Sequence, residues 1–328
     1  MVPSFQILAL SGGGYLGLYT ATVLSHLEQA CGVPLGRKFD LLAGTSVGGI
    51  IALGLAAEVP AKEIKSAFEE FGTTIFSRRS VPKTSVGRGF DLLRSALTPK
   101  YDSAGLRETL LSLFPKGLLI GDLLHPVIIP TVNLTKGKPQ IFKTPHHPTF
   151  VTDLHRSVID VAIAGAAAPT FFPIAEVANE LYADGGLYAN APDILALHEA
   201  EHFLGASVDG VRLLSVGTTT AQFSFSHEHG NNIGITGWLS DQRLINVILA
   251  SQQQSVGYMA AHRLGDRYLR LDALQSKEQE RYLALDVATE AAQKTIRGLA
   301  DSTAQEHASD PILKSILEHT AKVPTFYP

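Results

Sequence analysis

The sequence contains a single cysteine, Cys31, among its 328 residues. One cysteine excludes an intrachain disulfide framework and fits a reducing compartment such as the cytoplasm. The amino terminus lacks the basic and apolar regions of a signal peptide. The formal net charge is −4, so the chain as a whole has no basic surplus that would attract nucleic acid. We therefore expect a cytoplasmic protein that does not bind nucleic acid.

Long apolar runs are also absent from the sequence. Residues 41–57 and 161–175 are uncharged, but glycines or prolines interrupt them and both are shorter than the ~20 apolar residues of a membrane-spanning helix. Both are interpreted as buried core. Hydrophobic residues make up 45% of the chain and charged residues 18%, which is typical of a globular protein. Because no repeat or flexible linker divides the sequence, we predict one domain over 1–328, with its core at about 5–300 and a helical C-terminal tail.

The apolar pattern alternates between strand and helix. Short apolar runs at 5–10 and 39–43 are typical of buried strands, and residues 15–30 and 47–57 have helical character. This order predicts an α/β fold with a mainly parallel central sheet flanked by helices. Further strands are expected at 127–133, 140–143, 181–183 and 211–216, and further helices at 61–71, 103–114, 158–166, 194–204, 241–264, 277–297 and 312–319.

The second strand leads directly into a nucleophile-elbow pattern, Gly-x-Ser-x-Gly, at residues 44–48. The pattern stands in the required context of strand, tight turn and helix. Gly44 and Gly48 permit the close backbone approach of that turn. Ser46 would lie at a helix N-terminus, where free N–H groups and the helix dipole favour developing negative charge. We therefore predict Ser46 as the nucleophile.

The first strand ends in a glycine turn, Gly12, Gly13 and Gly14, at the carboxyl edge that also carries the elbow. Backbone N–H groups of this turn are predicted to form an oxyanion hole, in which each donor lowers the barrier by about 3 kcal/mol. With Gly17 the turn also fits a dinucleotide-binding fingerprint, which needs an acidic residue at the end of the second strand. Asp40 instead comes near the start of that strand. The oxyanion hole is therefore the favoured interpretation.

Asp184 follows the strand-like residues 181–183 and precedes two glycines, which would place its carboxylate at a strand end. An Asp-Gly pair alone is usually a simple turn; here it accompanies an elbow and a glycine turn. An aspartate with its ordinary pKa of about 3.9 is a weak base, but burial would raise that pKa. We expect a partly dry site in which Asp184 accepts the Ser46 proton and an acyl-enzyme forms.

Together the glycine turn, the elbow and Asp184-Gly185-Gly186 resemble the motifs of the patatin-like phospholipase family. Residues 164–173 resemble the segment that precedes the aspartate in that family. The resemblance implies a three-layer patatin-like fold, a Ser–Asp dyad, no cofactor and membrane phospholipids as substrate. Tyr15 stands where many relatives carry a basic residue, so backbone donors alone are expected to form the oxyanion hole.

Within this family, residues 12–21 resemble effector phospholipases of anti-phage (CBASS) systems, which degrade the cell membrane when a cyclic di- or oligonucleotide binds. The resemblance implies such a nucleotide as activator and peripheral action at the inner membrane; a regulated enzyme of this kind is also a candidate homo-oligomer.

Residues 77–100 hold six Lys and Arg residues against one acid. This segment is either a solvated surface loop or a site for lipid headgroups or a phosphate-bearing ligand. The candidate ligand residues are Arg78, Arg79, Lys83 and Arg88.

Other functions remain as alternatives. A constitutive lipase or esterase would show the same motifs, and a non-enzymatic nucleotide sensor would keep the same scaffold. A Ser–His–Asp hydrolase would carry its histidine after the serine, but its elbow would come later than the second strand. Its candidate histidines are His198, His202, His227 and His229. The histidine pairs at 146–147 and at 227 and 229 lack the partners of a zinc site, so no metal is expected.

Overall fold

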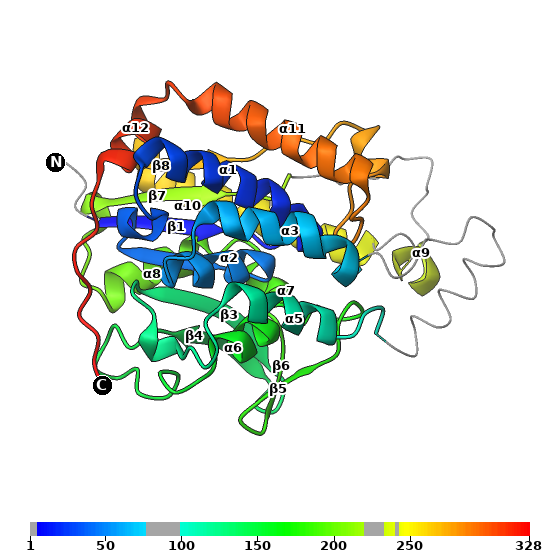
Figure 1. Ribbon diagram of the computed structural model, residues 1–328, viewed down its shortest axis with the longest axis horizontal. Helices are drawn as coiled ribbons and strands as arrows, with labels where there is room; N and C mark the ends of the chain where they lie inside the picture. Colours follow the sequence, from blue (N-terminus) through cyan, green and yellow to red (C-terminus); the bar gives the residue numbers. More distant parts are fainter. Residues whose placement is uncertain (1–4, 77–98, 220–232, 240–242) are drawn as a thin grey trace.

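The computed structural model describes residues 5–76, 99–219, 233–239 and 243–328. Across these residues one sheet of eight strands has the order β5-β6-β3-β2-β1-β7-β8, and β4 pairs with β3 (Figure 1). The strands are β1 (Phe5–Leu10), β2 (Leu41–Gly44), β3 (Val127–Asn133), β4 (Lys138–Lys143), β5 (Ala175–Val177), β6 (Glu180–Asp184), β7 (Val211–Val216) and β8 (Tyr268–Leu271).

The centre of the sheet is parallel and one side of it is antiparallel. β1 runs parallel to β2 and β7, and the β2–β3 and β7–β8 pairs are also parallel. β4 and β6 run antiparallel to β3, and β5 runs antiparallel to β6. The expected mainly parallel α/β sheet is confirmed, while the antiparallel direction of β6 was not anticipated.

Helices cover both faces of the sheet because successive strand residues point to opposite sides. Leu8 and Leu10 of β1 belong to the larger core, whereas Ile7 and Ala9 belong to the smaller one. The larger core includes residues of α1 (Gly17–Cys31), α2 (Val47–Ala56), α3 (Ala61–Phe76), α5 (Ala104–Leu113), α6 (Val158–Gly165), α11 (Glu290–His307) and α12 (Pro311–Glu318). The smaller core includes α8 (Asp193–His202) and the end of α10 (Arg243–Leu264), while α7 (Gly186–Ala189) and α9 (Ile235–Leu239) are short (Figure 1).

The pairing of β3 brings the ends of β2 and β6 together. Both strands lie along the same edge of β3, with β2 beside its first residues and β6 beside its last. Because β2 is parallel and β6 antiparallel to β3, their C-terminal ends face each other. Ala43 pairs with Ile128 and Asp184 pairs with Thr131, three residues further along β3. Ser46 lies three residues beyond Ala43, so Asp184 is placed beside the elbow.

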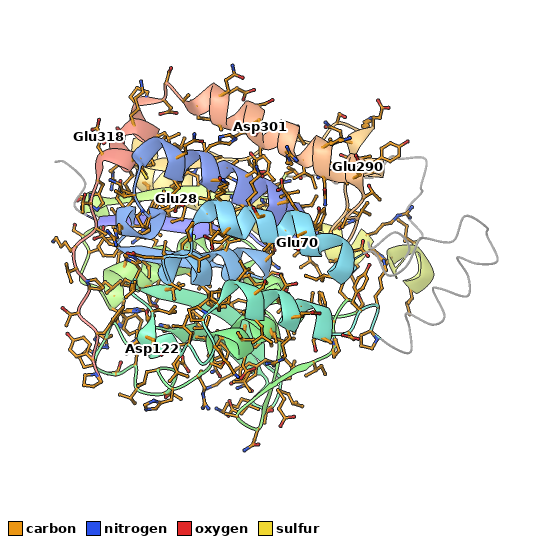
Figure 2. The ribbon with its side chains drawn as sticks, in the orientation of Figure 1. Glu28, Glu70, Asp122, Glu290, Asp301 and Glu318 are labelled. Carbon is orange, nitrogen blue, oxygen red and sulfur yellow. The ribbon has the colours of Figure 1, made fainter. Side chains whose placement is uncertain are left out.

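Two acidic side chains, one partly buried and one buried, form hydrogen bonds at the opposite, amino edge of the sheet. Glu28 of α1, labelled in Figure 2, accepts hydrogen bonds from the N–H groups of Leu35 and Ala61 and so fixes the start of α3. Asp40 accepts a hydrogen bond from the N–H of Gln6 and pairs with His319 of the C-terminal tail. The acid that a dinucleotide site would need therefore lies at the edge away from the glycine turn.

The prediction of a helix at 277–297 is confirmed for residues 290–297 and wrong for residues 277–289. α11 begins only at Glu290, where the Thr289 side chain accepts a hydrogen bond from the N–H of Ala292, and it continues to His307. The preceding residues form turns and a short 3-10 helix, and the chain at 285–286 contacts the glycine turn and Tyr101. These tertiary contacts override the local helical preference. A second helix in the tail is confirmed as α12, which Asp310 caps.

Two predictions from the sequence concern a basic ligand-binding segment and the lack of a membrane-spanning helix. Arg78, Arg79, Lys83 and Arg88 lie outside the described residues, so their ligand role stays a prediction. In the part of the chain that the structure describes, no helix combines the length and the apolar character required to cross a bilayer.

Candidate active site

The elbow forces Ser46 into a backbone conformation that serine rarely adopts. Its φ is 54° and its ψ is −126°, at the junction of β2 and α2. Such a conformation costs of order 1–3 kcal/mol and is maintained by its surroundings. A Cβ atom at Gly44 would lie 2.1 Å from the carbonyl oxygen of Gly48, and one at Gly48 would lie 2.5 Å from that of Leu10. Any residue larger than glycine at 44 or 48 would therefore open the turn and displace Ser46.

Asp184 is buried beside this serine, with 4% of its surface exposed. Its carboxylate accepts hydrogen bonds from the Ser46 hydroxyl and, at 2.7 Å, from the N–H of Gly186. Burial raises the pKa of Asp184 to about 6, although the two hydrogen bonds oppose the shift. A carboxylate with this pKa is a far better proton acceptor at neutral pH than an exposed one.

The glycine turn lies directly against the elbow, since a Cβ atom at Gly12 would be 3.1 Å from the Cβ of Ser46. The N–H of Gly12 donates to the carbonyl oxygen of Asn190 at 2.9 Å, so it is already engaged. Among the described residues, the N–H groups of Gly13 and Gly14 have no backbone acceptor. Of the three amides predicted for the oxyanion hole, these two are therefore available to a bound substrate.

Tyr15 extends into the helical layer. The side chain is fully buried, and a Cβ atom at Gly72 of α3 would lie 2.1 Å from its ring. Gln293 of α11 lies near its hydroxyl, and burial raises the pKa of Tyr15 to about 12. The side chain thus locks the glycine turn to α3 and α11, and it occupies a structural rather than an oxyanion-binding position.

A pocket with an almost wholly apolar lining reaches Ser46 between α3 and α5. The hydroxyl of Thr109, its main polar group besides Ser46, is satisfied by the carbonyl oxygen of Gly105. Such a slot suits the acyl chain of a lipid. The lining residues are Gly14, Ser46, Val47, Ile50, Ala67, Phe68, Gly72, Ile75, Leu106, Thr109, Leu110, Leu113, Ala166 and Phe172. These lining residues were not predicted from the sequence, because the apolar faces of α3 and α5 are indistinguishable from ordinary core until the fold is known.

The segment after Asp184 connects the elbow and the glycine turn. Thr45 donates its hydroxyl hydrogen to the carbonyl oxygen of Ala189 at 2.6 Å, and Gly12 binds that of the next residue, Asn190. The elbow and the glycine turn thus form hydrogen bonds to successive carbonyl oxygens, those of residues 189 and 190. Asn190 was not identified from the sequence, because its partners Gly12 and Gln252 are distant from it in the chain.

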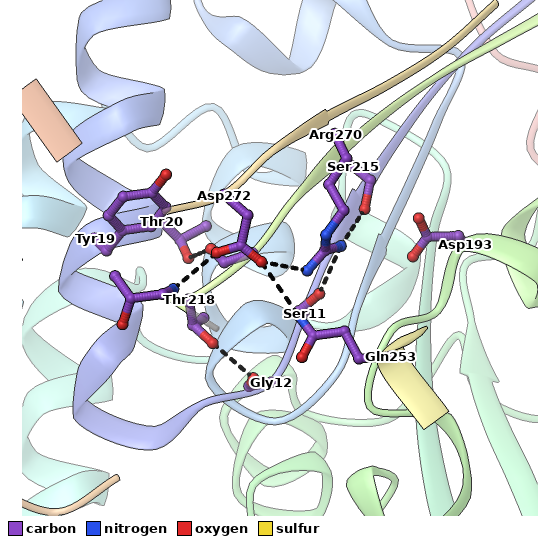
Figure 3. A network of polar contacts seen from close by, with 12 residues as sticks. Ser11, Gly12, Tyr19, Thr20, Asp193, Ser215, Thr218, Gln253, Arg270 and Asp272 are labelled. Atoms are coloured by element: carbon purple, nitrogen blue, oxygen red, sulfur yellow. Dashed lines mark hydrogen bonds and ion pairs between the residues drawn. The ribbon is translucent and has the colours of Figure 1, made fainter. Parts of the chain in front are cut away.

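Polar residues at the ends of β7 and β8 form a network of contacts that reaches the glycine turn (Figure 3). The Thr218 hydroxyl donates to the carbonyl oxygen of Gly12 at 3.0 Å. Asp272 accepts a hydrogen bond from the N–H of Thr219 at 3.0 Å and forms an ion pair with Arg270 at 2.7 Å. This network was also missed, because β8 lies far along the chain from the glycine turn.

The alternative sites receive no support from the described residues. His198 and His202 stack on each other, exposed on the second half of α8, and the buried His146 is hydrogen-bonded to Glu199. No group of three His, Cys, Asp or Glu residues suited to a metal ion occurs in the described part of the chain. The remaining triad candidates, His227 and His229, lie outside it.

A serine that lies beside a buried carboxylate and an apolar pocket fits an acyl hydrolase whose substrates carry hydrocarbon chains. The family model for patatin-like phospholipases matches residues 8–197, and the chain belongs to this family. The protein is therefore a lipid acyl hydrolase.

Three relatives with the name cGAMP-activated phospholipase are similar along most of the chain. One from Pseudomonas aeruginosa is 43% identical, covering 99% of this chain and 96% of that protein. One from Vibrio cholerae is 36% identical over 87% of this chain and 86% of that protein. One from Escherichia coli is 32% identical over 98% of this chain and 94% of that protein.

Proposed function

We propose that the protein hydrolyses ester bonds of membrane phospholipids, with Ser46 as nucleophile and Asp184 as general base. The observation that carries this proposal is the hydrogen bond between the Ser46 hydroxyl and a buried carboxylate whose pKa is raised to about 6. The apolar pocket at Ser46 supports it further, because an acyl chain placed there would bring its ester carbonyl to the serine.

The reaction proceeds in two steps, formation of an acyl-enzyme and its hydrolysis. Asp184 takes the Ser46 proton while the serine oxygen forms a bond to the ester carbonyl carbon. The N–H groups of Gly13 and Gly14 stabilise the resulting oxyanion. The tetrahedral intermediate then collapses, and the departing alcohol of the lysolipid takes the proton from Asp184. In the second step, Asp184 deprotonates a water that attacks the acyl-enzyme, releasing the fatty acid and returning the proton to Ser46.

We further propose that a cyclic nucleotide switches this activity on, and that the enzyme then acts peripherally at the inner membrane in anti-phage defence. Support for the nucleotide switch comes from the three relatives named as cGAMP-activated phospholipases. The proposed activator is therefore cGAMP, and the basic segment with Arg78, Arg79, Lys83 and Arg88 is a candidate contact for its phosphates or for lipid headgroups. Nucleotide-dependent assembly into homo-oligomers would be detected by sedimentation velocity.

The test is release of fatty acid from phosphatidylethanolamine–phosphatidylglycerol vesicles, with and without cGAMP. We expect activity of the wild type only with cGAMP, and its loss in both Ser46→Ala and Asp184→Asn. Equal activity without the nucleotide would identify a constitutive lipase. Nucleotide binding without ester hydrolysis under any condition would identify a sensor.

A further inference from the structure

A side chain outside the sequence motifs also holds the segment that joins the elbow to the glycine turn. The side-chain amide of Gln252, in α10, spans the turn formed by residues 187–190. Its Oε1 accepts a hydrogen bond from the N–H of Asn190 at 2.9 Å, and its Nε2 donates to the carbonyl oxygen of Leu187 at 3.0 Å. Asn190 in turn accepts the hydrogen bond from Gly12. One amide group therefore sets the position of the chain that both catalytic turns contact.

The neighbouring residue of α10 reaches the other side of the site. Gln253 donates to Asp272 at 3.3 Å, as Figure 3 shows. Asp272 binds the N–H of Thr219, and the adjacent Thr218 holds the carbonyl oxygen of Gly12. Two consecutive glutamines therefore connect α10 to the aspartate loop and to the support of the glycine turn.

The part of α10 nearest the site is partly buried, and Ile245 near its start packs against the larger core. The fully buried residues of α10 are Ala260 and Leu264, both in the C-terminal half of the helix. Gln252 lies nearer the middle and is partly exposed, and its two hydrogen bonds connect this part of α10 to Leu187 of α7 and to Asn190. Residues of α7 and α10 do not line the apolar pocket. Substitutions in α7 or α10 should therefore change the position of the reacting groups without changing the affinity for the substrate.

We propose that Gln252 is a positioning residue, which holds the 187–190 segment so that Asp184, Ser46 and the glycine turn keep the spacing needed for acyl transfer. The inference rests on the proposed function, since it assigns Gln252 a role in that reaction. Removing the amide would leave the N–H of Asn190 and the carbonyl oxygen of Leu187 without their partner and release the turn. A misplacement of about 1 Å among reacting groups can cost about 100-fold in rate.

The experiment compares Gln252→Met with Gln254→Met in the cGAMP-activated vesicle assay. Methionine keeps the length of the side chain but cannot form the two hydrogen bonds, and Gln254 is an exposed glutamine on the same helix. We expect kcat of Gln252→Met to fall about 10- to 100-fold, with KM within about twofold of the wild type. The rate of Ser46 labelling by a fluorophosphonate should fall in parallel, while Gln254→Met should match the wild type in both.

A second variant covers the case in which Gln252→Met does not fold. Gln252→Glu keeps the acceptor for the N–H of Asn190 but removes the donor to Leu187, so its kcat should fall less while its circular dichroism stays native. Unchanged kcat in the folded variants, or a change in KM alone, would overturn the positioning role while the proposed function stands. A wild type without ester hydrolysis, or an active Ser46→Ala, would instead overturn the proposed function and this inference with it.

Discussion

The Ser46 hydroxyl donates a hydrogen bond to the Asp184 carboxylate although the strands that carry them, β2 and β6, run in opposite directions. The contact arises because both strands border the same edge of β3 and end toward each other. It places the proposed nucleophile and its proposed base side by side without an intervening histidine. The chemistry of the proposed reaction therefore depends on the protonation state of one buried carboxyl group.

The pH dependence of turnover should follow Asp184. The group is a base only when deprotonated, and burial raises its pKa to about 6. We therefore expect kcat/KM to fall tenfold per pH unit below about pH 6 and to level off above it. The measurement is a pH profile on a soluble short-chain ester. An acidic limb near pH 4, the value for an exposed aspartate, would contradict a buried base.

The same shift predicts that Asp184→Asn gains stability while losing activity. The folded pKa of about 6 lies above the ordinary 3.8. Folding of the wild type is therefore most favourable below pH 3.8, where the carboxyl is neutral in both the folded and the unfolded state, and this stability is lost as the pH rises through 6. Asparagine does not titrate. The free energy of unfolding of Asp184→Asn should therefore exceed that of the wild type by up to about 3 kcal/mol at pH 8 and equal it near pH 4. Urea denaturation at the two pH values measures the difference.

Ser46→Gly and Ser46→Ala should both be inactive but should differ in stability. At φ 54° and ψ −126° a side chain with Cβ is strained, whereas glycine is not. We expect Ser46→Gly to be more stable than Ser46→Ala by about 1–2 kcal/mol, the reverse of the usual order within a helix or strand. Thermal unfolding of the two variants provides the measurement. If alanine were the more stable, the elbow strain would be refuted.

The ion pair of Lys100 with Asp286 should contribute strongly to stability. Asp286 is 6% exposed and also accepts a hydrogen bond from the Tyr101 hydroxyl at 2.9 Å. Lys100→Met would leave this carboxylate buried without its cation, so we expect a loss of about 3 kcal/mol in the free energy of unfolding, partly recovered by adding Asp286→Asn.

The matched control for this pair is Lys294→Met. Lys294 pairs with Glu290 on the exposed side of α11, where the two side chains are 73% and 80% exposed. This variant should change stability by less than about 0.5 kcal/mol. Equal losses in both lysine variants would show that burial of Asp286 has no special effect.

Local sequence patterns predicted the parts of the site that are made by a few consecutive residues. The elbow and the glycine turn require glycine where backbone atoms approach closely, as at Gly44, and such requirements are visible in the sequence. They did not show that the N–H of Gly12 is taken by Asn190, or that the helix expected at 277–297 begins at Glu290. Both outcomes depend on partners that are distant in the chain.

The sequence by itself determined which residues are the candidates for the chemistry: a serine on a sharp turn, amides on a glycine turn, and an aspartate at a strand end. Steric limits on neighbouring backbone atoms make those turns recognisable without knowledge of the fold. Only the tertiary structure decided that β6 runs antiparallel, that α3 and α5 enclose an apolar pocket, and that Gln252 reaches the segment beside Asp184. These arrangements depend on strand pairing and helix packing between distant segments, whose energies are spread over many residues and leave no local pattern.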